Sequence, residues 1–188
     1  NIAAMFLNSG KYKSALVVGA EVITKATDFT DRNTCVLFGD GAGCMILENT
    51  KEKKPAYIYV TSQGELEGAL YVDKYVRMDG KKVYQFAVGA LEKCIKKVLD
   101  DCDLSLEDID TIIPHQANIR IVQSVAKSLG IDIGHFFMNI ENYGNTSAAS
   151  IAIALDEYIT GKEDTKNKQI ILASFGSGFT YGAALLTL

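Results

Sequence analysis

The sequence contains only two histidines and no cysteine pair in C-x-x-C spacing. Zinc sites in proteins usually combine several cysteines and histidines at short spacing, so this composition disfavours a metal centre. The four cysteines lie in apolar or helical segments. We therefore predict reduced core thiols of a cytosolic protein, rather than disulfides, at Cys35, Cys44, Cys94 and Cys102.

The chain also lacks the features that draw a protein to a membrane or to nucleic acid. No apolar run approaches the ~20 residues that span a bilayer. The 188 residues carry a net charge of −4, so we expect no general attraction to nucleic acid or to an anionic lipid surface. With 48% hydrophobic residues, the chain can fill one core or two small lobes.

Short apolar runs alternate with helical patterns along the chain, which is typical of an α/β protein. We expect helices over 2–9, 83–102, 117–130 and 145–160. We expect strands over 14–23, 56–64, 108–114, 135–140, 169–175 and 181–188, and two strands joined by a glycine turn over 35–48. The run 14–23 has the composition of a buried strand, and 65–82 is predicted to link two lobes.

The opening segment NIAAMFLNSGKYK is typical of the middle and end of an amphipathic helix. Ile2, Met5 and Phe6 form its apolar stripe, and Ser9 and Gly10 supply a stop signal. No residue suited to an N-cap precedes the stripe. We therefore expect that the chain begins inside a helix and that a segment upstream is missing.

Two glycine-rich segments share the pattern F-G-x-G. LFGDGAG covers 37–43 and SFGSGFTYG covers 174–182, each between apolar runs. The echo hints at two lobes built on one plan, although glycine turns are common enough for coincidence. A dinucleotide site would need a helix directly after the glycines. Strand-like MILE follows GDGAGC instead, so we predict a structural turn there.

Polar groups gather at the ends of three predicted strands. His115 follows TIIP, Asn145 opens a buried helix, and FGSGFTYG exposes backbone N–H groups. His115 alone could merely bond a neighbouring carbonyl, and Asn145 could be an N-cap, but Thr146 and Ser147 could cap equally well. Strand ends are common ligand sites in α/β proteins. The set favours negative charge developing on oxygen, as in acyl transfer or enolate formation.

Covalent acyl transfer also needs a nucleophile. A reactive thiol requires a helix N-terminus or a cationic neighbour that lowers its pKa. Cys35 and Cys44 flank a strand–turn–strand segment, while Cys94 and Cys102 lie on or just past a charged helix. None of them suits that role.

Four motifs in order, LFGDGAG, PHQANIRI, YGNTSAAS and FGSGFTYGAALL, resemble the β-ketoacyl-acyl carrier protein synthase III family over the whole chain. The resemblance implies an α/β, thiolase-like fold in αβαβα layers with two related halves. On this basis residues 1–75 are the end of the first half plus a linker, and 76–188 are the whole second half. The family's nucleophile lies in A-A-C-[SA]-G-F, absent here, so we expect the chain to start after it and to be inactive alone.

The same resemblance implies a Cys-His-Asn triad of a condensing acyltransferase that initiates type II fatty acid synthesis. The missing cysteine takes an acyl group from acyl-CoA, and malonyl-acyl carrier protein is then decarboxylated and joined to it. His115 and Asn145 would donate to the enolate oxygen. The loop Gly176, Ser177 and Gly178 would supply the backbone oxyanion donor, at or beside Ser177, which replaces the family's usual glycine. No cofactor and no metal are implied.

The resemblance also assigns residues that bind the carrier protein, and it implies a cytoplasmic homodimer. The docking segment is Gln116, Ala117, Asn118, Ile119 and Arg120, and Lys127 could extend it. Gly80, Tyr84 and Asn118 would line the pantetheine tunnel. Phe29 stands where the family often has proline or leucine, near the acyl pocket.

Two other functions remain open. One is a related condensing enzyme with another starter or acceptor, such as a polyketide or quinolone priming synthase. The other is a non-catalytic subunit that docks a carrier protein and lacks its nucleophile by nature. The residue at the start of the helix that ends near Ser9 separates them, because only the enzymes need a cysteine there.

Overall fold

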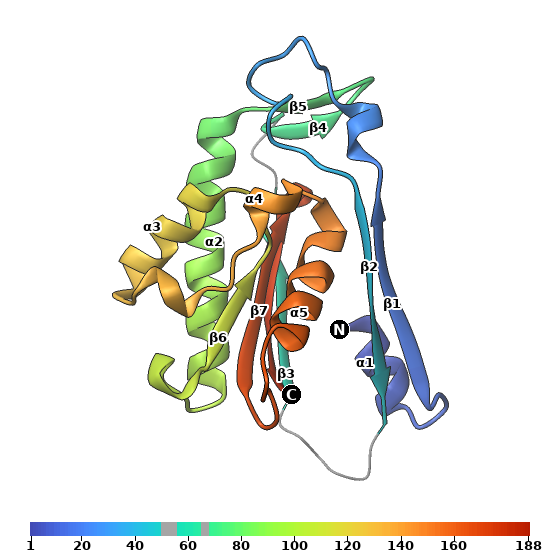
Figure 1. Cartoon of the computed structure of the whole chain (residues 1–188), viewed down its shortest axis with the longest axis vertical. Coiled ribbons are helices and arrows are strands. Elements are labelled where there is room, and N and C mark those ends of the chain that lie inside the picture. The colour runs from blue at the N-terminus through green and yellow to red at the C-terminus, as the bar shows by residue number, and fades with distance from the viewer. Residues whose placement is uncertain (50–55, 65–67) are drawn as a thin grey trace.

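The structure is a computed structural model that describes residues 1–49, 56–64 and 68–188 (Figure 1). The helices are α1 (Ile2–Asn8), α2 (Gly80–Asp101), α3 (Ile119–Leu129), α4 (Ile140–Tyr143) and α5 (Ser150–Thr160). Short 3-10 turns are η1 (Ile23–Ala26), η2 (Leu106–Asp108), η3 (Ile133–His135), η4 (Ser147–Ala149) and η5 (Ser177–Phe179). The strands are β1 (Ser14–Glu21), β2 (Gly41–Glu48), β3 (Ala56–Ser62), β4 (Leu70–Val72), β5 (Val76–Met78), β6 (Thr111–Pro114), β7 (Gln169–Gly176) and β8 (Thr180–Thr187).

A four-stranded sheet organises the molecule, with the strand order β3-β8-β7-β6. Strands β6 and β7 are parallel, while β7–β8 and β8–β3 are antiparallel. Helices α2 and α3 cover one face of this sheet, α5 covers the other, and the antiparallel pair β1–β2 lies beyond α5 (Figure 1). Helix and sheet layers therefore alternate, as the sequence predicts. No helix in the described ranges is long and apolar enough to cross a membrane.

Apolar side chains fill both faces of the central sheet. On one face the buried stripe of α2 packs against α3, β7 and β8. Its spacing of three and four residues is that of one helix face, and it comprises Val83, Ala87, Ala90, Leu91, Cys94, Ile95, Val98 and Leu99. On the other face Ala154, Leu155 and Tyr158 of α5 pack against β6 and β7.

Small residues let the β1–β2 pair approach α5 closely. A Cβ added at Gly19 would lie 2.4 Å from the Ala148 carbonyl oxygen, and one at Gly43 would lie 2.7 Å from the Ala152 Cβ. Gly41 and Gly43 thus act through close packing within strand β2, so the turn that we predict for GDGAGC does not extend over residues 41–44. A nucleotide-binding helix does not follow them, because residues 41–48 are strand β2.

The structure bears on the segment around the predicted boundary between the halves, residue 75, which stays a prediction. Strand β3 pairs with β8 along its whole length, so it belongs to the sheet of the second half. The predicted linker is also partly ordered structure, since β4 and β5 form a hairpin that spans residue 75. Asp79 then accepts a hydrogen bond from the Lys82 backbone N–H, and this cap starts α2 three residues earlier than predicted. Residues 65–67 of the linker lie outside the described residues.

Two predicted strands are replaced by turns. The first strand of the expected pair, over 35–40, is replaced by turns. Just before it, the Asp31 carboxylate accepts a hydrogen bond from the Thr34 hydroxyl, and the Asp31 backbone carbonyl accepts one from the Cys35 N–H. Such local bonds favour turns over a strand. Within 135–140, only Phe136 forms a bridge, to Ile112. Asp132 caps η3 ahead of this bridge and Asn139 begins α4, so no continuous strand forms.

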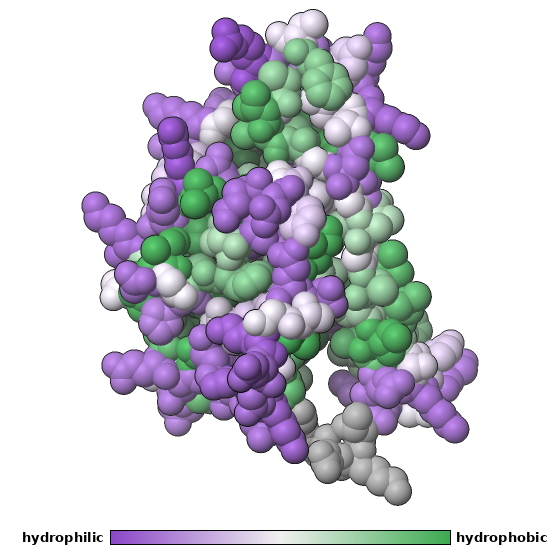
Figure 2. Space-filling view, in the orientation of Figure 1, coloured by the Kyte–Doolittle hydropathy of each residue, from purple (hydrophilic) through white to green (hydrophobic). Residues whose placement is uncertain are grey.

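The apolar stripe of α1 and the outer face of β1–β2 are exposed, contrary to the prediction of a buried strand over 14–23. Leu16 is 63% exposed, Ile46 69% exposed and Ile2 72% exposed. Part of this hydrophobic surface is visible beside β1 and β2 in Figure 2. Alternation along β2 explains it, because Met45 and Leu47 turn inward while Ile46 turns outward.

Gly39 gives a direct test of the packing between the two parts of the fold. A Cβ at this position would lie 2.0 Å from the Tyr143 carbonyl oxygen, so Gly39→Ala must displace backbone. We expect Gly39→Ala to lower the free energy of unfolding, measured with urea, by roughly 2 kcal/mol or more.

The matched control is Gly89→Ala in the middle of α2, where an added Cβ meets nothing within 4 Å. That substitution should raise the free energy of unfolding by about 0.5–1 kcal/mol, because alanine favours helix. Equal stability of the two variants would contradict the packing described above.

Candidate active site

The fold puts His115 at the carboxyl end of β6. Pro114 pairs with Ala173 in the parallel ladder, and the His115 backbone N–H extends it with a 2.8 Å bond to the Ala173 carbonyl. The Ala117 N–H then bonds the His115 carbonyl at 2.8 Å, which turns the chain. The Phe175 ring meets the imidazole edge-on at 5.5 Å between centroids. The orientation of the imidazole is therefore fixed from two strands.

Asn145 is held in a turn between α4 and α5. Its backbone N–H donates to the Leu37 carbonyl at 2.9 Å, and its carbonyl accepts from the Gly39 N–H at 3.0 Å. The side-chain Oδ1 accepts the Ser147 N–H at 2.9 Å. Because the oxygen of the amide is engaged within the turn, its NH₂ group is the part available as a donor.

His115 and Asn145 line one cavity of about 490 Å³. Ile23 and Leu37 form one wall, and the β4–β5 hairpin forms the opposite wall with Leu70 and Met78. Most sequence-predicted site residues meet here. They are Gly80, Tyr84, His115, Ala117, Asn118, Asn145, Gly176 and Ser177. None of the lining residues in the described chain is an aspartate, glutamate, lysine or arginine.

The two F-G-x-G segments both contribute to the wall of this cavity. Phe38 and Phe175 both line it, one from each part of the chain. After Phe175, Gly176 pairs with Thr180 and the Ser177 hydroxyl donates to the Leu70 carbonyl at 3.3 Å. Gly178 has φ +125°, a conformation open mainly to glycine, and it lies outside the cavity wall.

The predicted docking segment divides into a buried and an exposed part. Gln116 is only 1% exposed, and its side chain bonds Pro114, Phe137 and Asn139. Its assignment to carrier-protein docking stays a prediction, and in this structure its side chain supports the turn after β6 from the inside. Ala117 and Asn118 are half-buried at the cavity, and Asn118 also caps α3. Ile119, Arg120 and Lys127 are exposed on α3.

Tyr84 lines the cavity and connects helices α2 and α3. Its hydroxyl lies 2.6 Å from the Ser124 Oγ on α3. Gly80, at the first turn of α2, also lines the cavity. Phe29, which we expected near the acyl pocket, is 70% exposed and is not part of the wall. Its neighbours Ile23 and Asn33 contribute instead.

The cysteines lie away from the cavity and are unpaired. Cys94 is fully buried in the core, Cys35 and Cys102 are partly buried, and burial raises the pKa of Cys94 to about 12. Burial also raises the pKa of Cys102. Cys44 is exposed on the outer face of β2, so the prediction of four core thiols is wrong for it. The raised pKa values at Cys94 and Cys102 oppose a nucleophilic role.

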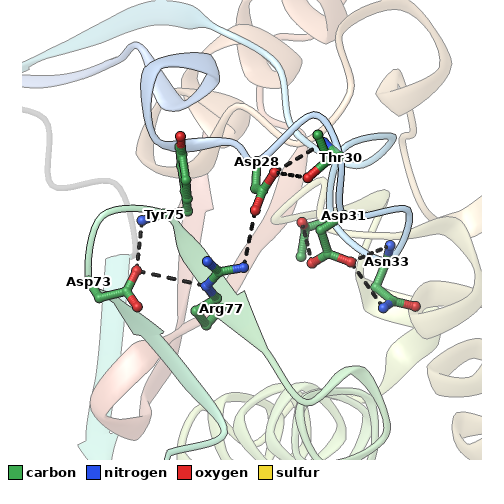
Figure 3. Close-up of polar contacts among 8 residues, drawn as sticks. Asp28, Thr30, Asp31, Asn33, Asp73, Tyr75 and Arg77 are labelled. Carbon is green, nitrogen blue, oxygen red and sulfur yellow. Dashed lines mark hydrogen bonds and ion pairs between the residues drawn. The ribbon is translucent and has the colours of Figure 1, made fainter.

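Sequence reasoning missed an ion pair that joins the two walls of the cavity. Arg77 on β5 donates to Asp28 at 3.3 Å, and its guanidinium lies over the Tyr75 ring, as Figure 3 shows. Asp28 belongs to the segment that supplies Ile23 and Asn33, while Arg77 belongs to the hairpin. No local pattern in either stretch signals this pairing.

A second cavity, of about 520 Å³, lies on the α5 side of His115. Met45 of β2, Ala148 and Ile151 near the start of α5, and Ser174 of β7 line it. His115 thus lines both cavities, together with Ser147, Phe175 and Gly176. The sequence does not predict this second cavity, because its walls come from distant strands.

The layered α/β fold, with His115 at the end of β6 and Asn145 in the turn before α5, places the chain in the thiolase-like class. The model of 3-Oxoacyl-[acyl-carrier-protein (ACP)] synthase III matches residues 1–64, and that of its C-terminal part matches residues 99–188. The chain belongs to the 3-oxoacyl-[acyl-carrier-protein] synthase III family.

Individual relatives agree with this membership. The beta-ketoacyl-[acyl-carrier-protein] synthase III of Acholeplasma laidlawii is 50% identical over 188 residues, which are 100% of this chain and 60% of that protein. The crystal structure of the 3-oxoacyl-[acyl-carrier-protein] synthase III of Aquifex aeolicus matches with a TM-score of 0.92 at 41% identity, covering 100% of this chain and 62% of that one. The priming β-ketosynthase of the R1128 polyketide biosynthetic pathway matches with a TM-score of 0.90 at 30% identity, covering 100% and 60%. The chain spans about 60% of the length of the first curated relative.

Burial in this apolar surrounding lowers the pKa of His115 from 6.5 to about 4, because the charged imidazolium loses its hydration. Between these values the unfolded chain binds a proton that the folded chain does not bind. The His115 contribution to stability is therefore complete above about pH 6.5 and decreases as the pH falls towards 4.

We expect NMR of ring-labelled protein to show His115 still neutral at pH 5.5. The His115→Gln variant assigns the signal by its disappearance. A titration midpoint near pH 6.5 would contradict the burial of the imidazole.

Proposed function

We propose that this chain carries the enolate-stabilising site of a condensing acyltransferase that initiates type II fatty acid synthesis. The observation that supports it best is the shared cavity of His115 and Asn145, which has donors but no charged side chain among its described lining residues. Preorganised neutral donors in a site with little water stabilise negative charge that develops on oxygen. Family membership supports the same chemistry.

In the first half-reaction a cysteine thiolate attacks the thioester of an acyl-CoA, the C–S bond to coenzyme A breaks, and coenzyme A leaves as its thiolate. The four cysteines of this chain do not line the cavity, so we propose that the nucleophile lies in a part of the protein outside these 188 residues. The backbone of the Gly176–Gly178 loop, at or beside Ser177, would bind the oxyanion of the tetrahedral intermediate.

In the second half-reaction malonyl-acyl carrier protein loses carbon dioxide. The electron pair of the breaking C–C bond moves into the thioester, whose oxygen becomes enolate-like. His115 and Asn145 would each donate a hydrogen bond to that oxygen. The enolate carbon then attacks the acyl-enzyme, a C–C bond forms, and the cysteine leaves to give 3-oxoacyl-acyl carrier protein.

The lack of cationic lining residues supports decarboxylation. Nothing among the described lining residues can form an ion pair with the malonyl carboxylate, whereas the enolate oxygen has two donors within reach. The environment therefore favours loss of the carboxylate as neutral carbon dioxide over its retention as an anion.

Substrate delivery follows from the mouth of the cavity. Gly80, Tyr84 and Asn118 would line the path of the pantetheine arm. Arg120 and Lys127 on the exposed side of α3 suit an acidic carrier protein because they are positively charged, and the exposed Ile119 adds an apolar contact. We also propose, from the family, that the whole protein is a cytoplasmic homodimer without a cofactor.

A related priming synthase is the second candidate. The 30% identity to the priming β-ketosynthase of the R1128 pathway favours keeping it open. The same chemistry at His115 and Asn145 would serve both, and the acyl-CoA and carrier protein that react fastest separate them. A non-catalytic docking subunit would show neither reaction.

His115→Ala in the full-length protein tests the proposed role. We expect malonyl-carrier protein decarboxylation to fall roughly 100-fold or more, since one donor to the enolate oxygen is lost. Acylation of the cysteine from acyl-CoA should fall less than about tenfold, because this step does not form the malonyl enolate. Radiolabelled acyl transfer and carbon dioxide release measure the two steps separately.

The matched control is His135→Ala on η3, which should leave both steps unchanged because His135 lies outside the cavity. Equal loss of acylation and decarboxylation in His115→Ala would contradict the proposed division of labour.

Arg120→Glu tests carrier-protein docking. We expect the KM for malonyl-carrier protein to rise roughly three- to tenfold, since an exposed ion pair is worth up to about 1 kcal/mol and charge reversal adds repulsion. The effect should shrink at high salt. Lys166→Glu, the same reversal on the loop before β7, should not change KM; an equal rise would show that only net charge matters.

A further inference from the structure

Ser150 lies directly behind the imidazole of His115. It is the first residue of α5 and is only 2% exposed. Its Oγ lies 2.7 Å from the Nδ1 of His115, and the Gln116 backbone N–H points at the same oxygen at 3.4 Å. The side of the imidazole that faces away from the cavity therefore has one defined partner.

The direction of the protons follows from the chemistry of a hydroxyl, which has one proton and two acceptor sites. The Gln116 N–H can only donate, so Ser150 Oγ accepts from it. Among the described residues, His115 Nδ1 lies within hydrogen-bond distance of Ser150 Oγ and can accept the proton of its hydroxyl. If Nδ1 carried a proton instead, Oγ would accept twice and its own proton would be buried without a partner.

The Nδ1–H tautomer should therefore be roughly tenfold or more less populated than the Nε2–H tautomer. The reason is that a buried donor without an acceptor loses the hydrogen bond it had with water. The favoured chain of bonds runs from the Gln116 N–H to Ser150 Oγ, and from the Ser150 O–H to His115 Nδ1. The remaining imidazole proton is then on Nε2, the nitrogen opposite Ser150.

We propose that Ser150 is the positioning residue that fixes His115 as its Nε2–H tautomer, with this proton directed into the cavity. Ser150 need not touch a substrate for this role. Only the catalytic consequence rests on the proposed function, namely that Nε2–H donates to the enolate oxygen. In the other tautomer a lone pair would face that oxygen and repel its negative charge.

The hydrogen bonds of the buried Gln116 side chain hold its backbone N–H in position to reach Ser150. The Gln116 side chain donates to the Pro114 carbonyl at 2.9 Å and to the Phe137 carbonyl at 3.2 Å. Its Oε1 accepts the Asn139 N–H at 3.2 Å. These bonds fix the peptide whose N–H reaches Ser150, so Gln116 acts as a support of the site.

This hydrogen-bond network returns to α5, the helix that carries Ser150. The Asn139 side chain donates to Glu157 at 2.9 Å. The turn after β6 is thus connected to α5 at two points, through Ser150 at the start of the helix and through Glu157 two turns later. A shift of the helix relative to His115 would strain both connections.

The test is a tautomer measurement by long-range ¹H–¹⁵N NMR of the ring nitrogens in full-length protein, with the His115 signals assigned by loss in His115→Gln. The wild-type protein should show predominantly Nε2–H. Ser150→Ala should lower the Nε2–H to Nδ1–H ratio roughly tenfold, and Ser150→Thr, which keeps the hydroxyl, should restore it.

Ser128→Ala is the matched control, because it removes a hydroxyl that bonds Glu92 instead of the imidazole; it should leave the ratio unchanged. A backbone amide spectrum confirms that each variant is folded. An unchanged ratio in folded Ser150→Ala, or a wild-type imidazole protonated on Nδ1, overturns the inference whatever the enzyme activity.

Kinetics separate this inference from the proposed function. If the ratio changes and decarboxylation in Ser150→Ala falls roughly tenfold while cysteine acylation is kept, both are supported. If the ratio changes but the wild-type protein does not decarboxylate malonyl-carrier protein, the positioning role stands and the proposed function fails.

Discussion

The site depends on one close backbone contact between the two parts of the chain. Residues 37–39 pair with the turn at Asn145 through bonds of 2.9 and 3.0 Å. The chain can come this close only because residue 39 has no side chain, as a Cβ there would lie 2.0 Å from the Tyr143 carbonyl oxygen. This contact brings Asn145 to the cavity that His115 reaches from β6. The segment 35–40 therefore holds the Asn145 turn by backbone hydrogen bonds instead of forming a strand.

Neutrality is the second constraint on the cavity. Its apolar walls disfavour the imidazolium, so the pKa of His115 is lowered to about 4 and the ring is neutral at physiological pH. A neutral imidazole has one N–H and one lone pair, and its tautomer therefore decides whether it can donate. The Asn145 amide avoids this ambiguity, because its oxygen is occupied by the Ser147 N–H. We propose that both residues are thus oriented as donors before a substrate arrives.

Part of the cavity lining could be predicted from the sequence, because polar residues at strand ends are informative. His115 and the loop after β7 follow apolar runs that form the parallel strands β6 and β7, and parallel strands bring their ends to one edge of a sheet. Asn145 instead lines the cavity from the turn before α5. Sequence reasoning failed where the structure is determined by contacts between segments that are distant in the sequence. No local pattern indicates that β3 pairs with β8, and Gln116 turns inward although its neighbours His115 and Asn118 line the cavity. Ser150 is hidden within the helical text TSAAS, where only its contact with His115 distinguishes it from Ser147. The pair Arg77–Asp28 joins segments 49 residues apart.

The most direct test is a crystal structure of the full-length protein with a malonyl-thioester analogue that cannot lose carbon dioxide. The account predicts that the thioester oxygen lies within about 3.2 Å of both His115 Nε2 and Asn145 Nδ2. A thioester oxygen that contacts neither nitrogen, with the analogue bound in the cavity, would contradict it.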